Sequence, residues 1–133
     1  MMDERQRAVA LECFEGAGDG RLSFPQVLGR LAEAGFEGYV VDFRRGESGY
    51  FLPSGAEARF AGHRPDVAAA FDATALKAAI LEAQTGAEGY SYAGFCAKAG
   101  AAGCALYLVS LPGRRVVYVG RSGETHTEHF PPG

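Results

Sequence analysis

An internal repeat limits the folds open to this chain more than any other feature of its sequence. Residues 23–57 align with residues 91–125 at a constant offset of 68 positions without a gap, and eight positions are identical. The identical pairs are Ser23/Ser91, Ala34/Ala102, Gly35/Gly103, Tyr39/Tyr107, Val41/Val109, Tyr50/Tyr118, Ser54/Ser122 and Gly55/Gly123. The hydrophobic pattern also stays in phase across the aligned segments. A repeat of this kind predicts two copies of one structural unit.

Each copy begins with a predicted helix. Ser23 and Ser91 stand at N-cap positions, and the segment SFPQ at 23–26 has the pattern of a capping box with proline in the first turn. Apolar residues then follow at i, i+3, i+4 and i+7 in both copies. They are Phe24, Val27, Leu28 and Leu31 in the first copy, and Tyr92, Phe95, Cys96 and Ala99 in the second. Gly35 and Gly103 occupy the place of a left-handed C-cap, so both helices are predicted to end there.

A further helix is predicted before each of these, over 3–14 and over 72–84, where Asp72 is the expected N-cap. Three short strands are predicted after them in each copy, because the segments are rich in aromatic and β-branched residues and are separated by turn residues. The expected strands are 38–43, 50–53 and 56–60 in the first copy, and 105–111, 116–120 and 124–130 in the second.

The predicted fold is therefore α+β, an internally duplicated α-α-β-β-β unit with an antiparallel sheet and helices packed on one face. One half alone would hold too little core to be stable. We accordingly expect a single domain over residues 1–133, with pseudo-repeats at about 1–62 and 63–133 and a pseudo-two-fold axis between them.

Composition narrows the classes of partner. The 133 residues carry a formal net charge of −3, and basic residues occur at most in pairs, so neither nucleic acid nor an anionic membrane is an expected partner. The charged N-terminal segment has no signal-peptide pattern, and no apolar run is long enough to cross a bilayer, which favours a cytoplasmic location.

The three cysteines form no close pair of the kind that binds zinc or acts in redox chemistry. No cofactor is expected. Cys96 aligns with Leu28 and Cys104 with Phe36, so the thiols are interpreted as buried apolar groups.

Histidines and glutamates near the C-terminus form one candidate polar site. If residues 124–130 are a strand, His126 and His129 point to opposite faces and do not chelate one metal together. Glu124, His126 and Glu128 then share a face and form a low-grade candidate site, with His129 or Arg121 as possible additions. The other interpretation is a polar, solvent-facing edge strand, and no metal is assigned.

Four tyrosines form a second candidate site. Tyr39, Tyr50, Tyr107 and Tyr118 occupy equivalent positions in the two copies. Tyrosine combines an apolar ring with a polar tip, so a two-fold-related set is a candidate ligand groove or dimer interface. The alternative is that these tyrosines complete the rim of a hydrophobic core, and this is the favoured interpretation.

Three segments carry a resemblance to a known family. They are LAEAGFEGYVVDF, FCAKAGAAGCALYLVSL and RRVVYVGRSGETHTEHFP, which together resemble the YdfO-like family of small bacterial and prophage proteins, some of them labelled phage envelope proteins. The most specific part comprises Gly120, Arg121, Gly123, Glu124, Glu128, His129, Phe130 and Pro131. The resemblance implies an α+β fold and a prophage association, and it implies no catalytic or binding residues because the function of that family is uncharacterised.

Two functions remain open from the sequence. The first is a non-enzymatic binding or interaction module with an unknown protein or small-molecule partner, possibly a homodimer. The alternative is a metal-dependent or acid–base enzyme that uses the Glu124/His126/Glu128 strand face. A third hypothesis, an accessory protein that acts on a host partner, depends only on the prophage resemblance.

Overall fold

The chain passes twice through the order helix, helix, strand, strand, strand. The computed structural model describes residues 1–130, so Pro131, the last residue of the closing motif, lies outside the described residues. The elements are α1 (Glu4–Asp19), α2 (Phe24–Ala34), β1 (Gly38–Asp42), β2 (Glu47–Phe51), β3 (Glu57–Ala61), α3 (Ala73–Thr85), α4 (Tyr92–Ala101), β4 (Cys104–Ser110), β5 (Arg115–Gly120) and β6 (Thr125–His129). The predicted α+β class is confirmed.

The helices begin where the sequence places their caps. The Ser23 hydroxyl accepts a hydrogen bond from the Gln26 backbone amide, and the Gln26 side-chain oxygen accepts one from the Ser23 backbone amide, which completes the expected capping box. Ser91 and Asp72 cap α4 and α3 in the simpler way, each through one side-chain oxygen. Gly35 has a φ of 91°, a left-handed conformation that favours glycine, and it ends α2 as predicted.

All six strands form one antiparallel sheet in the order β3-β2-β1-β4-β5-β6. The β1–β2 and β4–β5 hairpins have the same pairing register once the offset of 68 is applied, since Tyr39 opposes Tyr50 as Tyr107 opposes Tyr118. At the centre of the sheet Val40 opposes Leu108, and these two residues are each other's counterparts in the repeat. This is the register expected if a pseudo-two-fold axis passes between β1 and β4.

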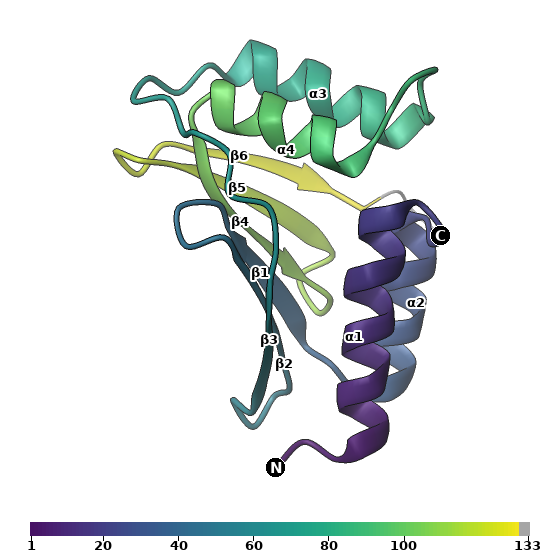
Figure 1. Ribbon diagram of the computed structural model, residues 1–133. Helices are drawn as coiled ribbons and strands as arrows, with labels where there is room; N and C mark the ends of the chain where they lie inside the picture. Colours follow the sequence, from purple (N-terminus) through teal and green to yellow (C-terminus); the bar gives the residue numbers. More distant parts are fainter. Residues whose placement is uncertain (131–133) are drawn as a thin grey trace.

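Both helix pairs cover the same face of the sheet (Figure 1). The buried strand residues alternate with more exposed ones, so they belong to one side of the pleat. The sheet residues that face the helices and join the core are Tyr39, Val41, Tyr50, Ala58, Tyr107, Val109, Val116 and Tyr118. This arrangement brings the repeat-related tyrosines beneath the helices, in the layer where the core lies.

The length and apolar character of the helices decide whether one of them could cross a membrane. None of the helices in residues 1–130 combines enough length with enough apolar character to span a membrane.

Candidate functional site

The four repeat-related tyrosines lie side by side on the helix-facing side of the sheet. Tyr39 stacks on Tyr50 with ring centroids 4.8 Å apart, and Tyr107 lies 5.4 Å from Tyr118. Only 3–6% of each residue is exposed. Their rings are therefore part of the core and do not form an exposed face on the molecule.

A fifth tyrosine, Tyr92 at the start of α4, contacts one of these four, Tyr107, from the helix side. Its hydroxyl lies 2.7 Å from the hydroxyl of Tyr107, so the two phenols share a hydrogen bond. The counterpart of Tyr92 in the first half is Phe24, which has no hydroxyl and instead packs edge-on against Phe130 at 5.8 Å. Tyr39 therefore has no equivalent of the bond that Tyr107 makes. We refer to Tyr39, Tyr50, Tyr92, Tyr107 and Tyr118 as the tyrosine cluster.

Three hydroxyls of the tyrosine cluster have no hydrogen-bond partner among the described residues. Those of Tyr39, Tyr50 and Tyr118 make no hydrogen bond to any of residues 1–130. Yet no side-chain nitrogen or oxygen in that range is completely buried without a partner, so each of these hydroxyls must reach space that water can enter. A buried hydroxyl left unpaired would cost about 1–3 kcal/mol. The three unpartnered polar tips of the cluster therefore each keep some surface that water can reach within a largely apolar setting.

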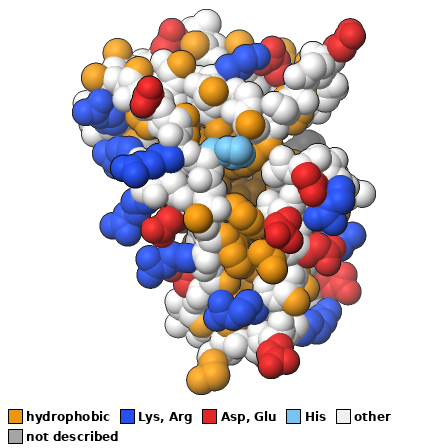
Figure 2. All heavy atoms as spheres, viewed as in Figure 1, with side chains coloured by type: hydrophobic (Ala, Val, Ile, Leu, Met, Phe, Trp, Pro, Cys, Tyr) orange, Lys and Arg blue, Asp and Glu red, His pale blue; other side chains and the backbone are white. Residues whose placement is uncertain are grey.

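Figure 2 shows a hollow surrounded by hydrophobic side chains between the two helix pairs, and the four sheet tyrosines of the tyrosine cluster face these helices. Aromatic contacts lead away from the tyrosine cluster on both sides. Phe60 lies 5.9 Å from Tyr50 and stacks on Phe14 of α1 at 5.2 Å. On the other side, His63 lies 5.8 Å from Tyr92. The hydroxyls are thus set among rings from both helix pairs and from the sheet.

Burial keeps these phenols neutral. It raises the pKa of all five residues of the tyrosine cluster above the ordinary value of 10.0, because the phenolate form loses its hydration. The proximity of Tyr39 raises the pKa of the other four further. Each free hydroxyl consequently offers one donor and two acceptor positions to whatever enters the hollow.

His126 and Glu128 lie beside the tyrosine cluster on β6. The Nε2 atom of His126 is 2.5 Å from an oxygen of Glu128, and the imidazole stacks on the Tyr118 ring with centroids 6.2 Å apart. The two side chains are 14% and 30% exposed. They occupy the helix-facing side of the strand, whereas His129 is exposed on the opposite side, level with Arg115 in the neighbouring strand. The two imidazoles diverge, as expected for an extended segment.

The predicted trio is not assembled. Glu124 lies in the turn before β6, where its Oε1 atom accepts a hydrogen bond from the Ser122 amide at 3.2 Å. The strand predicted over 124–130 begins one residue later, at Thr125, because the Glu124 side chain forms a hydrogen bond within the turn. No group of three or more His, Cys, Asp or Glu side chains within the described chain is arranged to hold a metal ion. Arg121 lies in the same turn and points elsewhere, toward the Val67 carbonyl at 3.3 Å.

The thiols are packed in the interior. Cys13, Cys96 and Cys104 are buried and free, and burial raises the pKa of each to about 11. A thiol with a pKa in that range is protonated at neutral pH and is a poor nucleophile. The placement agrees with the interpretation of Cys96 and Cys104 as small hydrophobic groups.

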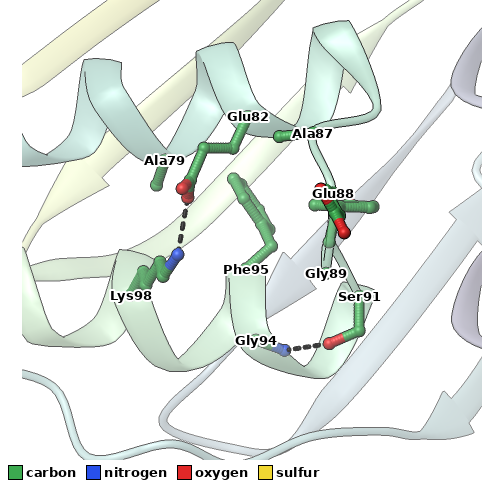
Figure 3. A pocket seen from close by; sticks show the side chains of 10 residues that line it. Ala79, Glu82, Ala87, Glu88, Gly89, Ser91, Gly94, Phe95 and Lys98 are labelled. Carbon is green, nitrogen blue, oxygen red and sulfur yellow. Dashed lines mark hydrogen bonds and ion pairs between the residues drawn. The ribbon is translucent and has the colours of Figure 1, made fainter.

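A smaller cavity of about 60 Å³ lies at the turn between α3 and α4 (Figure 3). Phe95 points into it, and the ion pair between Lys98 and Glu82, 2.6 Å apart, spans one side. This volume is well below the roughly 300–1,000 Å³ of typical small-molecule sites. The tyrosine cluster is the stronger candidate site because three of its hydroxyls have no partner among the described residues.

The sequence does not predict that Tyr92 and His63 contribute to this site. Tyr92 was read as one member of an apolar helical stripe, and only its pairing with Tyr107 gives it a polar role. The absence of a hydroxyl at its repeat counterpart, Phe24, was a signal that the two halves differ here. His63 carried no pattern at all, because its place beside Tyr92 depends on how the chain crosses between the halves.

Comparison with known proteins adds no named relative. No protein-family model matches the chain, and no curated protein matches it significantly. The resemblance to the YdfO-like family thus stays a prediction, and the candidate site is defined by its own geometry.

Proposed function

We propose that this protein is a non-enzymatic binding module that holds a small, largely apolar molecule in the hollow over the tyrosine cluster. The observation that carries the proposal is the set of three hydroxyls, on Tyr39, Tyr50 and Tyr118, that have no partner within the described chain and yet lie among aromatic rings. Ligand sites commonly combine an apolar lining with a few polar groups that fix orientation.

The chemistry of the lining defines the class of ligand. Aromatic walls favour a flat, apolar body, because ring faces and edges pack well against one another. The neutral hydroxyls favour one or two hydrogen-bonding groups on that body, in positions that water otherwise occupies. A planar aromatic compound with a hydroxyl, carboxyl or amide group meets both requirements.

The experiment uses the tyrosines as their own reporters. The chain has six tyrosines, of which five form the cluster and one, Tyr90, lies outside it and is 39% exposed. Protein labelled with fluorotyrosine is titrated with a set of planar aromatic fragments and followed by fluorine NMR. Binding in the hollow shifts the cluster signals and leaves the Tyr90 signal nearly in place. A fragment set that moves no signal, or moves Tyr90 as much as the cluster, refutes the proposal.

One observation favours a second function. The hydrogen bond of 2.5 Å between His126 and Glu128 fixes the orientation of an imidazole next to Tyr118. A carboxylate that holds an imidazole in this way is typical of a general base, so acid–base chemistry on the bound molecule is the alternative. It would use His126 and Glu128 without Glu124.

Turnover distinguishes the two functions. A fragment that binds is incubated with the protein, and its conversion is followed by mass spectrometry. Acid–base catalysis predicts conversion that is lost in His126→Gln and retained in the control His129→Gln, whose ring lies on the other face of the strand. Binding without conversion supports the non-enzymatic module.

A cytoplasmic location is part of the proposal. Free, buried cysteines at three positions within residues 1–130 suit a reducing compartment, where thiols stay unpaired.

A further inference from the structure

Three arginines from distant parts of the sequence converge on one hollow, separate from the tyrosine cluster. Arg44 follows β1, Arg64 lies in the segment between β3 and α3, and Arg121 lies in the turn between β5 and β6. Together with Phe43, Pro65, Asp66 and Val67 they line a hollow of about 570 Å³. Lys and Arg side chains gather along the left flank in Figure 2, where Figure 1 places these three segments.

The positive charges in this hollow are only partly balanced by acidic side chains of the described residues. None of the three arginines forms an ion pair with an acidic side chain in residues 1–130. The only acidic residue in the lining is Asp66, so the hollow carries a net positive charge although the whole chain carries −3. Two like charges 4 Å apart repel by about 1 kcal/mol even in water, and an anion between them removes that cost.

The backbone holds the arginines in place. The Gly62 amide donates a 2.7 Å hydrogen bond to the Gly46 carbonyl, which ties the segment that carries Arg64 to the β1–β2 turn. Further along, the Ala68 amide donates to the Gly100 carbonyl of α4 at 2.9 Å, and Arg121 donates to Val67. The arrangement is therefore built from fixed segments on both sides of Arg64.

Glycine at position 46 is required for this geometry. Its φ is +68°, and a Cβ atom built there would lie 3.1 Å from the Cβ of Arg64. Arg64 thus packs directly against the turn that also carries Arg44. The close approach brings two arginines, one from the β1–β2 turn and one from the segment between β3 and α3, to one hollow.

Apolar residues contribute part of the lining of the hollow. Pro65 and Val67 form part of its wall, and Phe43 lies fully buried beneath it. A volume of about 570 Å³ lies in the range of small-molecule sites and is much larger than a single inorganic anion needs. Arginine guanidinium groups bind phosphate oxygens through pairs of hydrogen bonds and also stack on flat rings.

From these features we infer that the hollow formed by Arg44, Arg64 and Arg121 is a binding site for a phosphate-bearing small molecule. The phosphate lies among the guanidinium groups, and the organic part lies against Pro65 and Val67. The site is independent of the tyrosine cluster, so either of the two can fail without the other.

The test uses the whole protein labelled with ¹⁵N and titrated with inorganic pyrophosphate, adenosine monophosphate and adenosine. The amide signals of Gly46 and Gly62 report on the hollow, because these residues join its two sides. Arg64→Gln is the main variant, and Arg121→Gln is a second one in case the first does not fold. Arg7→Gln removes the same charge from an exposed position on α1 and is the matched control.

Both phosphate compounds are expected to shift the two glycine signals, and adenosine alone is not. Each hollow variant should weaken binding about tenfold, the loss expected for one charged hydrogen bond, while Arg7→Gln leaves it unchanged. Adenosine monophosphate should bind more tightly than pyrophosphate, because its organic part can pack against Pro65 and Val67. Absence of any shift, or equal losses in the hollow variants and in Arg7→Gln, would overturn the inference.

Discussion

Tyr39 and Tyr107 give a matched pair of variants that isolates the free hydroxyls. The two residues are counterparts in the repeat, occupy equivalent places in the sheet, and are each 6% exposed. The polar difference between them is at the hydroxyl, since the Tyr107 hydroxyl bonds to Tyr92 at 2.7 Å and the Tyr39 hydroxyl bonds to no described residue. Replacing each with phenylalanine removes one oxygen atom and leaves the ring.

The expected losses of stability differ accordingly. Tyr107→Phe breaks a hydrogen bond and leaves the Tyr92 hydroxyl without its phenol partner in a partly buried place, which should lower the free energy of unfolding by about 1–2 kcal/mol. Tyr39→Phe breaks no bond to the protein, so its free energy of unfolding should stay within about 0.5 kcal/mol of the original protein. A difference of about 1 kcal/mol corresponds to a melting temperature difference of about 4 °C at this size.

Urea unfolding of the three proteins measures these free energies, provided that the slopes of the transitions agree. Equal losses in Tyr39→Phe and Tyr107→Phe would show that the Tyr39 hydroxyl has a partner in the protein. The reasoning that leads from unpaired hydroxyls to a ligand site would then be wrong.

Other predictions concern pH, capping and the arginine hollow. Burial raises the pKa of the cysteines from 9.0 to about 11. Because the thiols of the unfolded chain lose their protons at lower pH than those of the folded protein, the free energy of unfolding should fall as pH rises from about 9 toward 11. Denaturation at several pH values measures this fall. Ser23→Ala removes the N-cap of α2 and should lower the free energy of unfolding by about 1 kcal/mol, with Ser122→Ala, in an exposed turn, as the control. Gly46→Ala places a side chain at a φ of +68° beside Arg64; it should destabilise the protein by about 1–2 kcal/mol and weaken binding of pyrophosphate, as calorimetry would show.

The fold was largely predictable because its signals are local. N-caps at Ser23 and Ser91, the glycine at 35, and the alternation of apolar residues each depend on neighbours within a few positions, and the repeat supplies a second reading of every element. Burial of the repeat tyrosines follows from the same alternation. The start of β6 was misplaced because the hydrogen bond from Ser122 to Glu124 is a detail of one turn.

The candidate sites were predictable only in part, because they depend on contacts between distant segments. The sequence places the four repeat tyrosines at equivalent positions, but the partner of Tyr107 comes from α4 and Tyr39 has none, which only the packing of the helices decides. The arginine hollow shows the same limit more strongly. Arg44, Arg64 and Arg121 belong to three separate turns or loops, and no spacing in the sequence links them.

A crystal structure at a resolution that shows ordered water tests the central claim of this account directly. The account predicts water molecules or a bound molecule within hydrogen-bonding distance of the hydroxyls of Tyr39, Tyr50 and Tyr118, in a space that continues to the surface between the helix pairs. Hydroxyls bonded to other protein groups, or a space closed and empty of water, would contradict it.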